Sequence, residues 1–296
     1  MVKKIDEISE DELLLPGTRV CSGCGLSIAY RLALKALGKN TIITIPAGCS
    51  TVLQGMFPIS SAKVTVLNTA FETAASSASG IVASLKAQKK ENDFTVVAWA
   101  GDGGTADIGI QALSGSAERG DNFIYVCYDN EAYMNTGTQR SGATPYGALT
   151  TTTPSSGKMQ VKKNMPQIMA AHNIPYIATC CASYPVDFYN KFIKAKSIKG
   201  TKYIHIFAPC PPGWGFPTSK TVKLGKLAVE TGLFELYEIE NGILEFTDVT
   251  KNIYSNKFKR KQLADYFSTQ GRFAKLPKEI IERFQIEIDK KFENQK

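Results

Sequence analysis

The stretch AWAGDGGTADIG, residues 98–109, joins the end of an apolar run to a cluster of glycines that contains one carboxylate, Asp102. The run FTVVAWAG (94–101) has the β-branched and aromatic composition of a buried strand, and residues 107–120 have helical apolar spacing. A strand that ends in G-D-G-G brings its backbone close to a phosphate or a metal ion, or simply turns tightly. The stretch therefore predicts a strand–loop–helix unit.

The same alternation of short apolar runs and helix-like segments continues along most of the chain. Strands are expected at 41–48, 63–70, 94–101, 122–130, 176–181 and 203–210. Helices are expected at 26–38, 71–90, 107–120 and 185–200, with Gly38 and Gly200 as C-terminal caps. This alternation predicts an α/β fold, in which a parallel sheet is flanked by helices on both faces.

Four residues with ligand chemistry follow expected strand ends: Cys49, Asp102, Asn130 and Cys210. Ligands of such sheets bind beyond the carboxyl ends of the strands. Twenty-six residues separate Gly103 from Asn130, the length of one strand–helix–strand unit, so Asn130 is expected beside Asp102. A carboxylate, an amide oxygen and a backbone carbonyl form a partial shell for Mg²⁺, which two phosphate oxygens would complete.

The cysteines give a second signal. Cys21 and Cys24 are spaced C-x-x-C, which lets both thiolates reach one metal centre, and Cys49 and Cys210 could complete a set of four. The spacing alone leaves zinc, a redox dithiol and an iron–sulfur cluster open. The other cysteines, Cys127, Cys180 and Cys181, and both histidines, His172 and His205, are interpreted as structural.

Composition excludes several classes of function. The net charge is +8, but only KFKRK (257–261) is a dense basic cluster, so we expect no nucleic-acid binding; acidic partners or anionic substrates explain the charge equally well. No stretch of 18 apolar residues occurs, and the first twenty residues lack the apolar core of a signal peptide. We therefore expect a cytoplasmic protein without a membrane anchor.

Two segments depart from the strand and helix alternation: residues 133–158 and the tail after about residue 215. The Gly- and Thr-rich segment 133–158 has little periodicity and is interpreted as a functional lid. Beyond residue 215, a hairpin is expected over Asn241–Gly242, and an amphipathic helix over 276–292. The chain is thus expected to form a binding module at 1–215 and a C-terminal extension at 216–296 that packs on the module or on partner subunits.

The combination GDGG…YDNEAYMNTGTQ, residues 101–139, is similar to the beta subunits of the 2-oxoacid:ferredoxin oxidoreductases, the pyruvate synthase group, and the resemblance covers roughly residues 15–215. It implies a thiamine diphosphate-binding fold, with Mg²⁺ held by Asp102, Asn130 and the carbonyl of Ala132. It also implies a [4Fe–4S] cluster on Cys21, Cys24, Cys49 and Cys210, and it makes Asn135 the catalytic residue that faces the reacting end of the cofactor. The cofactor-binding residues it implies are Cys49, Gly101, Asp102, Gly103, Gly104, Thr105, Asn130, Ala132, Tyr133 and Asn135. Glu131 departs from the second asparagine that many thiamine diphosphate enzymes have at this position.

The implied activity is the oxidative decarboxylation of a 2-oxoacid, with pyruvate as the expected substrate and coenzyme A as the acyl acceptor. Electrons are expected to pass through the cluster to ferredoxin. Oxalate, 2-oxoglutarate, branched-chain oxoacids and phenylglyoxylate stay open as substrates. Implied partners are an alpha subunit that carries the pyrimidine-binding module, a gamma subunit and a ferredoxin-like delta subunit, or fusions of these. Glu72 is interpreted as a charge at a helix N-terminus and not as the activating glutamate. Two other hypotheses are a non-redox thiamine diphosphate enzyme half with a structural four-cysteine zinc, and a non-catalytic assembly or nucleic-acid-binding module.

Overall fold

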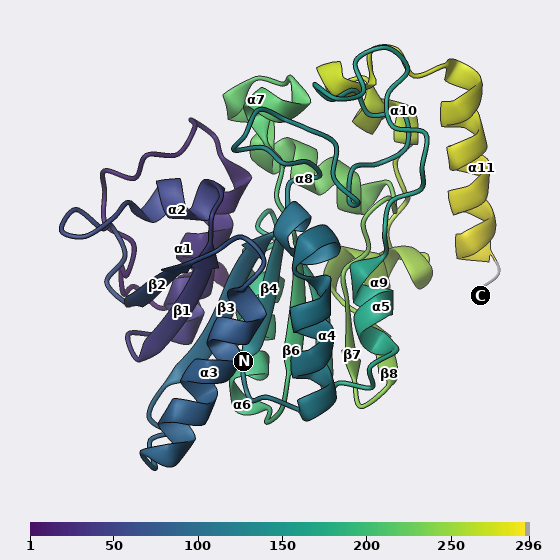
Figure 1. Ribbon diagram of the computed structural model, residues 1–296. Coiled ribbons are helices and arrows are strands. Elements are labelled where there is room, and N and C mark those ends of the chain that lie inside the picture. Colours follow the sequence, from purple (N-terminus) through teal and green to yellow (C-terminus); the bar gives the residue numbers. More distant parts are fainter. Residues whose placement is uncertain (294–296) are drawn as a thin grey trace.

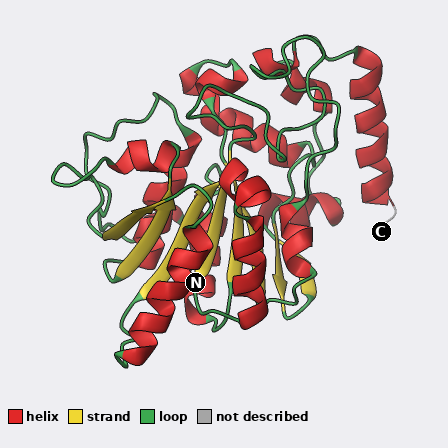
Figure 2. Ribbon diagram, viewed as in Figure 1, coloured by secondary structure: helices red, strands yellow, loops and turns green. Residues whose placement is uncertain are grey.

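An eight-stranded sheet forms the centre of the protein (Figures 1 and 2). A computed structural model describes residues 1–293. The strands are β1 (Thr41–Pro46), β2 (Thr65–Thr69), β3 (Thr95–Gly101), β4 (Ile124–Asp129), β5 (Tyr176–Cys181), β6 (Lys202–Phe207), β7 (Tyr237–Glu240) and β8 (Ile243–Phe246). Their order is β2-β1-β3-β4-β6-β5-β7-β8, parallel from β2 to β5 and antiparallel for β7 and β8. The predicted parallel α/β sheet and all six of its strands are confirmed.

Helices cover both faces of this sheet. They are α1 (Gly25–Leu37), α2 (Cys49–Gln54), α3 (Ala74–Ala87), α4 (Ile110–Arg119), α5 (Met165–Ala170), α6 (Pro185–Ser197), α7 (Pro211–Trp214), α8 (Thr221–Glu230), α9 (Asp248–Tyr254), α10 (Leu263–Phe267) and α11 (Lys278–Glu293). One apolar core packs α1 and α6 against the sheet, and a second packs α3, α4 and α5 against the opposite face (Figure 1). Within residues 1–293, no helix is both long and apolar enough to cross a membrane.

Two local predictions are wrong. Gly38 ends α1 with a φ of +82°, as expected, but α6 ends at Ser197 and Gly200 lies in the turn before β6. The helix expected from residue 107 begins at Ile110, after a π-helical turn over Gly104–Ile108. Asp107 explains this wide turn, because it accepts hydrogen bonds from Tyr133 Oη and from the backbone N–H of Gly142, which draw the segment toward the following loop.

Residues 216–293 extend the sheet and build a third apolar core. β7 pairs with β5, and the expected hairpin turns at Asn241 and Gly242, whose φ angles of +48° and +83° suit a type I′ turn. Phe207 and Trp214 share this third core with side chains of α8 and α10. The C-terminal segment, as residues 216–293 are called below, therefore lies against the ends of β4 and β6 (Figure 1).

Candidate active site

Four neighbouring strands end beside one another and carry the residues that the sequence singled out. β1, β3, β4 and β6 are adjacent in the sheet. Cys49 begins α2 just after β1, Asp102 follows β3, Asn130 follows β4 and Cys210 comes shortly after β6. The parallel register thus brings Asp102 and Asn130 to the same edge of the sheet, as predicted.

Three oxygen-bearing groups meet at this edge. The side-chain amide of Asn130 lies 2.9 Å from Asp102 Oδ1 and 3.0 Å from the carbonyl oxygen of Ala132. The Asn130 amide has two possible orientations. When its nitrogen faces Asp102 and Ala132, it donates a hydrogen bond to each of their oxygens. When its oxygen faces them, the three oxygens are neighbours. Carboxylate, amide and carbonyl oxygens are the ligands that Mg²⁺ takes in proteins. These three residues can hold Mg²⁺.

Asp102 is a buried carboxylate that lacks a cationic partner. It is 1% exposed, and burial raises its pKa well above the usual value, to which the negative charge of Asp129 adds. Ser141 Oγ donates a hydrogen bond to Asp102 Oδ2. Among residues 1–293, no lysine, arginine or histidine forms an ion pair with Asp102. Since a buried charge without a counter-charge is costly, this carboxylate fits a bound cation.

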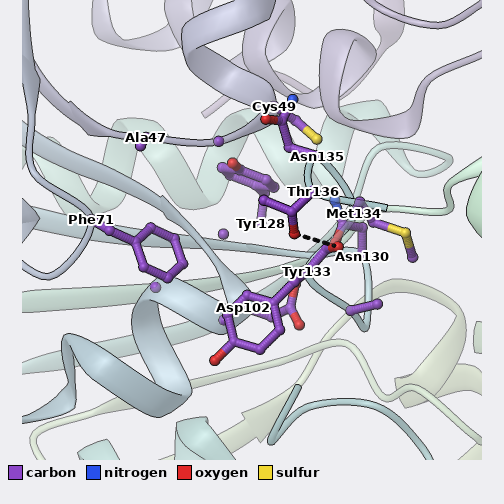
Figure 3. Close-up of a pocket in the computed structure, with 15 residues that line it drawn as sticks. Ala47, Cys49, Phe71, Asp102, Tyr128, Asn130, Tyr133, Met134, Asn135 and Thr136 are labelled. Atoms are coloured by element: carbon purple, nitrogen blue, oxygen red, sulfur yellow. Dashed lines mark hydrogen bonds between the residues drawn. The ribbon is translucent and has the colours of Figure 1, made fainter. Parts of the chain in front are cut away.

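A cleft with about 620 Å³ of space between its lining atoms opens over these residues (Figure 3). Its lining consists of Ala47, Gly48, Cys49, Phe71, Gly101, Asp102, Gly103, Gly104, Tyr128, Asn130, Ala132, Tyr133, Met134, Asn135 and Thr136. Nine of the ten expected cofactor-binding residues are among them. The exception is Thr105, which is fully buried and donates its hydroxyl to the carbonyl of Gly101, 2.8 Å away.

Gly103 makes room for an aromatic side chain as well as for a ligand. A β-carbon at Gly103 would lie 2.3 Å from the ring of Tyr133, so only glycine fits beneath this tyrosine. Tyr133 Oη in turn donates to Asp107 Oδ2, at 2.7 Å. The glycine cluster therefore has a packing role that its sequence pattern did not indicate.

The four expected cluster cysteines come from three segments that the fold brings together. The backbone N–H of Gly25, next to Cys24, donates to the carbonyl of Pro209, next to Cys210, at 3.1 Å. Burial, together with the nearby charges of Cys210, Cys24 and Cys21, raises the pKa of Cys49 to about 12. Among residues 1–293, however, no three His, Cys, Asp or Glu side chains are arranged to hold one metal ion.

Cys127, Cys180, Cys181 and His172, which the sequence analysis interprets as structural, are not among the residues that line the cleft. Cys127, Cys180 and Cys181 are buried within β4 and β5, at most 1% exposed. His172 follows the end of α5 and contacts Ser114 Oγ through Nε2.

Comparisons with known proteins agree with this arrangement. The family model described as "Thiamine pyrophosphate enzyme, C-terminal TPP binding domain" matches residues 46–206. The pyruvate synthase subunit PorB of Methanothermobacter thermautotrophicus is 52% identical over 287 residues, which cover 96% of this chain and 97% of that protein. The chain belongs to the beta subunits of the 2-oxoacid:ferredoxin oxidoreductases.

Two further relatives of this beta subunit are named for other 2-oxoacids. The ketoisovalerate oxidoreductase subunit VorB of Pyrococcus furiosus is 47% identical over 96% of this chain and 92% of its own length. The 2-oxoglutarate:ferredoxin oxidoreductase of Magnetococcus marinus, solved with 2-oxoglutarate, coenzyme A and succinyl-CoA bound, has a TM-score of 0.59 and 25% identity over 70% of each chain. The family is therefore clear, and the oxoacid differs among its members.

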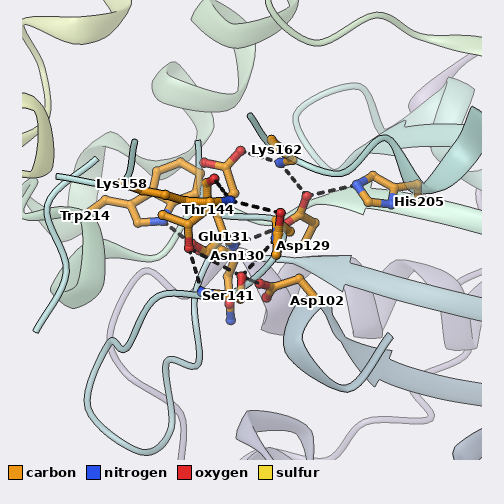
Figure 4. A network of polar contacts seen from close by, with 12 residues as sticks. Asp102, Asp129, Asn130, Glu131, Ser141, Thr144, Lys158, Lys162, His205 and Trp214 are labelled. Atoms are coloured by element: carbon orange, nitrogen blue, oxygen red, sulfur yellow. Dashed lines mark hydrogen bonds and ion pairs between the residues drawn. The ribbon is translucent and has the colours of Figure 1, made fainter. Parts of the chain in front are cut away.

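In this beta subunit a buried charge network lies behind the cleft, and the sequence did not predict it (Figure 4). Lys162 Nζ is 2.6 Å from both Asp129 Oδ2 and Glu131 Oε1, and His205 Nε2 is 2.9 Å from Asp129 Oδ2. Burial alone would raise the pKa of Asp129, but the charge of Lys162 and the hydrogen bonds from His205 and Lys162 together outweigh burial and hold the pKa below its usual range. His205, which the sequence analysis interprets as a core residue, is thus buried against Asp129, the last residue of β4 and the neighbour of Asn130.

The segment 133–158 packs onto the same network. Thr144 Oγ1 donates to the Glu131 carbonyl at 2.6 Å, and Lys158 Nζ donates to the carbonyls of Gly142 and Thr144 at 3.0 and 2.7 Å. Together with the bond from Ser141 to Asp102, these contacts tie the segment to the floor of the cleft. The signals available in the sequence were only the polar composition of the segment and the lysines that follow it.

Proposed function

We propose that this beta subunit binds Mg²⁺ and thiamine diphosphate in the cleft. With partner subunits, it oxidatively decarboxylates a 2-oxoacid in the presence of coenzyme A, and pyruvate is the substrate that we propose. The observation that carries the proposal is the buried, cation-free carboxylate of Asp102 beside the amide of Asn130 and the carbonyl of Ala132. This donor set matches a magnesium ion that bridges phosphate oxygens.

Each part of the cleft has a role in this proposal. Asp102, Asn130 and the Ala132 carbonyl would hold the cation, and the backbone of Gly103 and Gly104, which line the cleft, would face the diphosphate. Asn135, exposed at the cleft wall, contacts the reacting end of the cofactor and is the proposed catalytic residue. Thiamine diphosphate, when bound, supplies the electron sink for the carbanion chemistry. The chain itself orients that cofactor and surrounds it with apolar side chains such as Phe71 and Tyr128.

The four cysteines Cys21, Cys24, Cys49 and Cys210 are proposed to hold one [4Fe–4S] cluster that passes single electrons toward ferredoxin. Cys49 belongs to this set and also lines the cleft, which supports short electron transfer between the two sites. In a zinc site, four thiolates surround a single ion about 2.3 Å from each sulfur. A brown preparation with a broad visible absorption that dithionite bleaches would support the cluster, whereas a colourless, zinc-loaded preparation would refute it.

Partner subunits complete the site in this proposal. They are an alpha subunit with the pyrimidine-binding module, a gamma subunit and a ferredoxin-like delta subunit, separate or fused. Between α2 and β2, three large apolar side chains are exposed to solvent: Met56 at 67%, Phe57 at 95% and Ile59 at 59%. Apolar exposure of this kind is typical of a protein interface, and α2 also supplies Cys49 to the cleft wall. We therefore propose that the alpha subunit binds here.

The substrate is tested directly on the intact subunit complex. Reduction of a viologen dye is measured with coenzyme A and pyruvate, 2-oxoglutarate, oxalate, branched-chain oxoacids and phenylglyoxylate in turn. We expect the highest kcat/KM with pyruvate. A preference for another oxoacid would correct the substrate and leave the reaction class standing. Absence of reduction with every oxoacid, in a preparation with full iron and thiamine diphosphate content, would overturn the proposed function.

A further inference from the structure

An arginine of the C-terminal segment reaches the loop that carries the candidate magnesium ligands. Arg272 Nη1 lies 2.6 Å from Glu131 Oε2, and the two side chains are only 3% and 6% exposed. Glu131 stands between Asn130 and Ala132, and residues 130–132 are called the 130–132 loop below. Because neither buried charge can be left without its partner, this ion pair fixes the C-terminal segment to the loop.

The guanidinium of Arg272 has one available position. Its central carbon lies 3.6 Å from the centre of the Trp214 ring, its Nε donates to Gln270 Oε1 at 2.9 Å and its Nη2 donates to Tyr266 Oη at 3.1 Å. A planar guanidinium that stacks on a ring and forms directed hydrogen bonds cannot be replaced by a lysine ammonium. The remaining edge of the group faces Glu131, so the arginine is oriented before the contact is made.

Glu131 has an unusual backbone conformation that the contacts around it maintain. Its φ is +67°, in the left-handed region that residues other than glycine rarely adopt. Its N–H donates to Asp129 Oδ1 at 2.9 Å, its carbonyl accepts from Thr144 Oγ1, and its second carboxylate oxygen pairs with Lys162. This turn brings the side chain of Asn130 and the carbonyl of Ala132 within 3.0 Å of each other.

A second contact reaches the same loop from the tryptophan on which Arg272 stacks. Trp214, on which Arg272 stacks, donates its Nε1–H to the carbonyl of Asn130 at 2.7 Å. The C-terminal segment thus contacts Glu131 directly, and it supports Asn130 only through Trp214, which precedes the segment.

We propose that Arg272 is a positioning residue for the cation–diphosphate site: it holds Glu131 so that Asn130 and the Ala132 carbonyl stay directed at Asp102. The inference rests on the proposed function for the identity of the ligand. The arginine acts only through the 130–132 loop and touches no reacting atom. The C-terminal segment thereby becomes part of the cofactor site in addition to its packing role.

The test uses the intact subunit complex freed of thiamine diphosphate and Mg²⁺. Calorimetric titration with thiamine diphosphate at fixed Mg²⁺, and with Mg²⁺ at fixed thiamine diphosphate, is expected to give at least tenfold weaker binding for Arg272→Gln. Arg260→Gln is the matched control, because Arg260 also lies over an aromatic ring, Phe292, and pairs with Asp289 in the same C-terminal segment. The control is expected to bind both ligands within twofold of the wild type.

Glu131→Gln and the Glu131→Gln/Arg272→Gln double variant separate positioning from general stability. If Arg272 acts through Glu131, the double variant loses no more affinity than the weaker-binding single variant. Losses that add, or an unchanged affinity in Arg272→Gln, would overturn the inference. Should Arg272→Gln fail to assemble, Glu131→Gln alone decides, and unchanged affinity there refutes the role.

A measurement without ligands keeps this inference separate from the proposed function. Amide hydrogen exchange of the cofactor-free complex is expected to be faster over residues 130–134 in Arg272→Gln and unchanged there in Arg260→Gln. No increase would refute the positioning role whatever the cofactor is. If exchange is faster in Arg272→Gln but the wild-type complex does not bind thiamine diphosphate, the proposed function is refuted. The role of Arg272 in holding the 130–132 loop would then still stand.

Discussion

Replacing Asp102 with asparagine keeps the shape of the side chain and removes its charge. Burial and the nearby negative charge of Asp129 raise the pKa of this carboxylate, so ionised Asp102 destabilises the ligand-free fold. Each pKa unit by which the folded state raises it corresponds to about 1.4 kcal/mol. We therefore expect Asp102→Asn to be at least as stable as the wild type when Mg²⁺ and thiamine diphosphate are absent.

When Mg²⁺ and thiamine diphosphate are both present, we expect the wild type to be more stable than Asp102→Asn. At a hundred times its dissociation constant, a ligand that binds only the folded state stabilises it by about 2.7 kcal/mol. At an unfolding entropy of about 2.1 cal/mol/K per residue, that stabilisation raises the Tm of a chain of this size by about 4 °C. Asp102→Asn removes the one anionic ligand of the three-oxygen set, so its Tm should not respond to the ligands.

Scanning calorimetry of the subunit complex, in chelator and then in Mg²⁺ with thiamine diphosphate, measures both effects. Asp107→Asn is the control, because Asp107 lies on the same turn but is already paired with Lys163 at 2.9 Å. The control should lose stability in chelator and keep its ligand-induced rise in Tm. Iron content should be unchanged in both variants. A rise in Tm for Asp102→Asn equal to that of the wild type would refute the magnesium assignment.

Three other measurements test separate parts of the structure. Burial lowers the pKa of Lys202 to about 7, so the unfolded chain binds more protons between pH 7 and about 10 and stability falls as the pH is lowered through that range. Lys202→Met should then be more stable than the wild type near pH 7. In urea unfolding, its advantage in free energy of unfolding should shrink by about 1.4 kcal/mol for each pH unit up to about pH 10. A difference that stays constant with pH would contradict this. Cys210→Ser should lose iron and the broad visible absorption that dithionite bleaches, whereas Cys127→Ser, in the core of β4, should keep both. Phe57→Ser should leave the fold intact and weaken assembly with the alpha subunit in size-exclusion chromatography, and unchanged assembly would exclude this surface as the interface.

The sheet was predictable because its signals are local. Each strand is a short run of β-branched and aromatic residues, and parallel topology then brings the strand ends to one edge whatever lies between them. That is why the juxtaposition of Asp102 and Asn130 followed from spacing alone. The start of α4 was not predictable in this way, because a distant loop holds Asp107 and widens the preceding turn.

The charge network behind the cleft has no local signature. Lys162 stands next to Lys163, Arg272 lies in a segment with several lysines, and nothing in their sequence neighbourhood marks them as partners of buried carboxylates. Their role appears only when the fold brings them against Asp129 and Glu131. Sequence patterns thus located the ligands of the site, whereas the groups that hold those ligands in place depend on tertiary contacts.

The charges of this network also account for the glutamate at position 131. Lys162, whose side chain is 27% exposed, and the buried Arg272 bring two positive charges, and Asp129 and Glu131 supply two buried negative charges, so the pairs are balanced. Asp102 is then the single carboxylate left for a cation. An asparagine at position 131 would leave two cations against Asp129 alone, and the excess positive charge would oppose a divalent ion beside it. Glu131 is therefore required by the arginine of the C-terminal segment, and its departure from the asparagine of many thiamine diphosphate enzymes does not weaken the case for the cofactor.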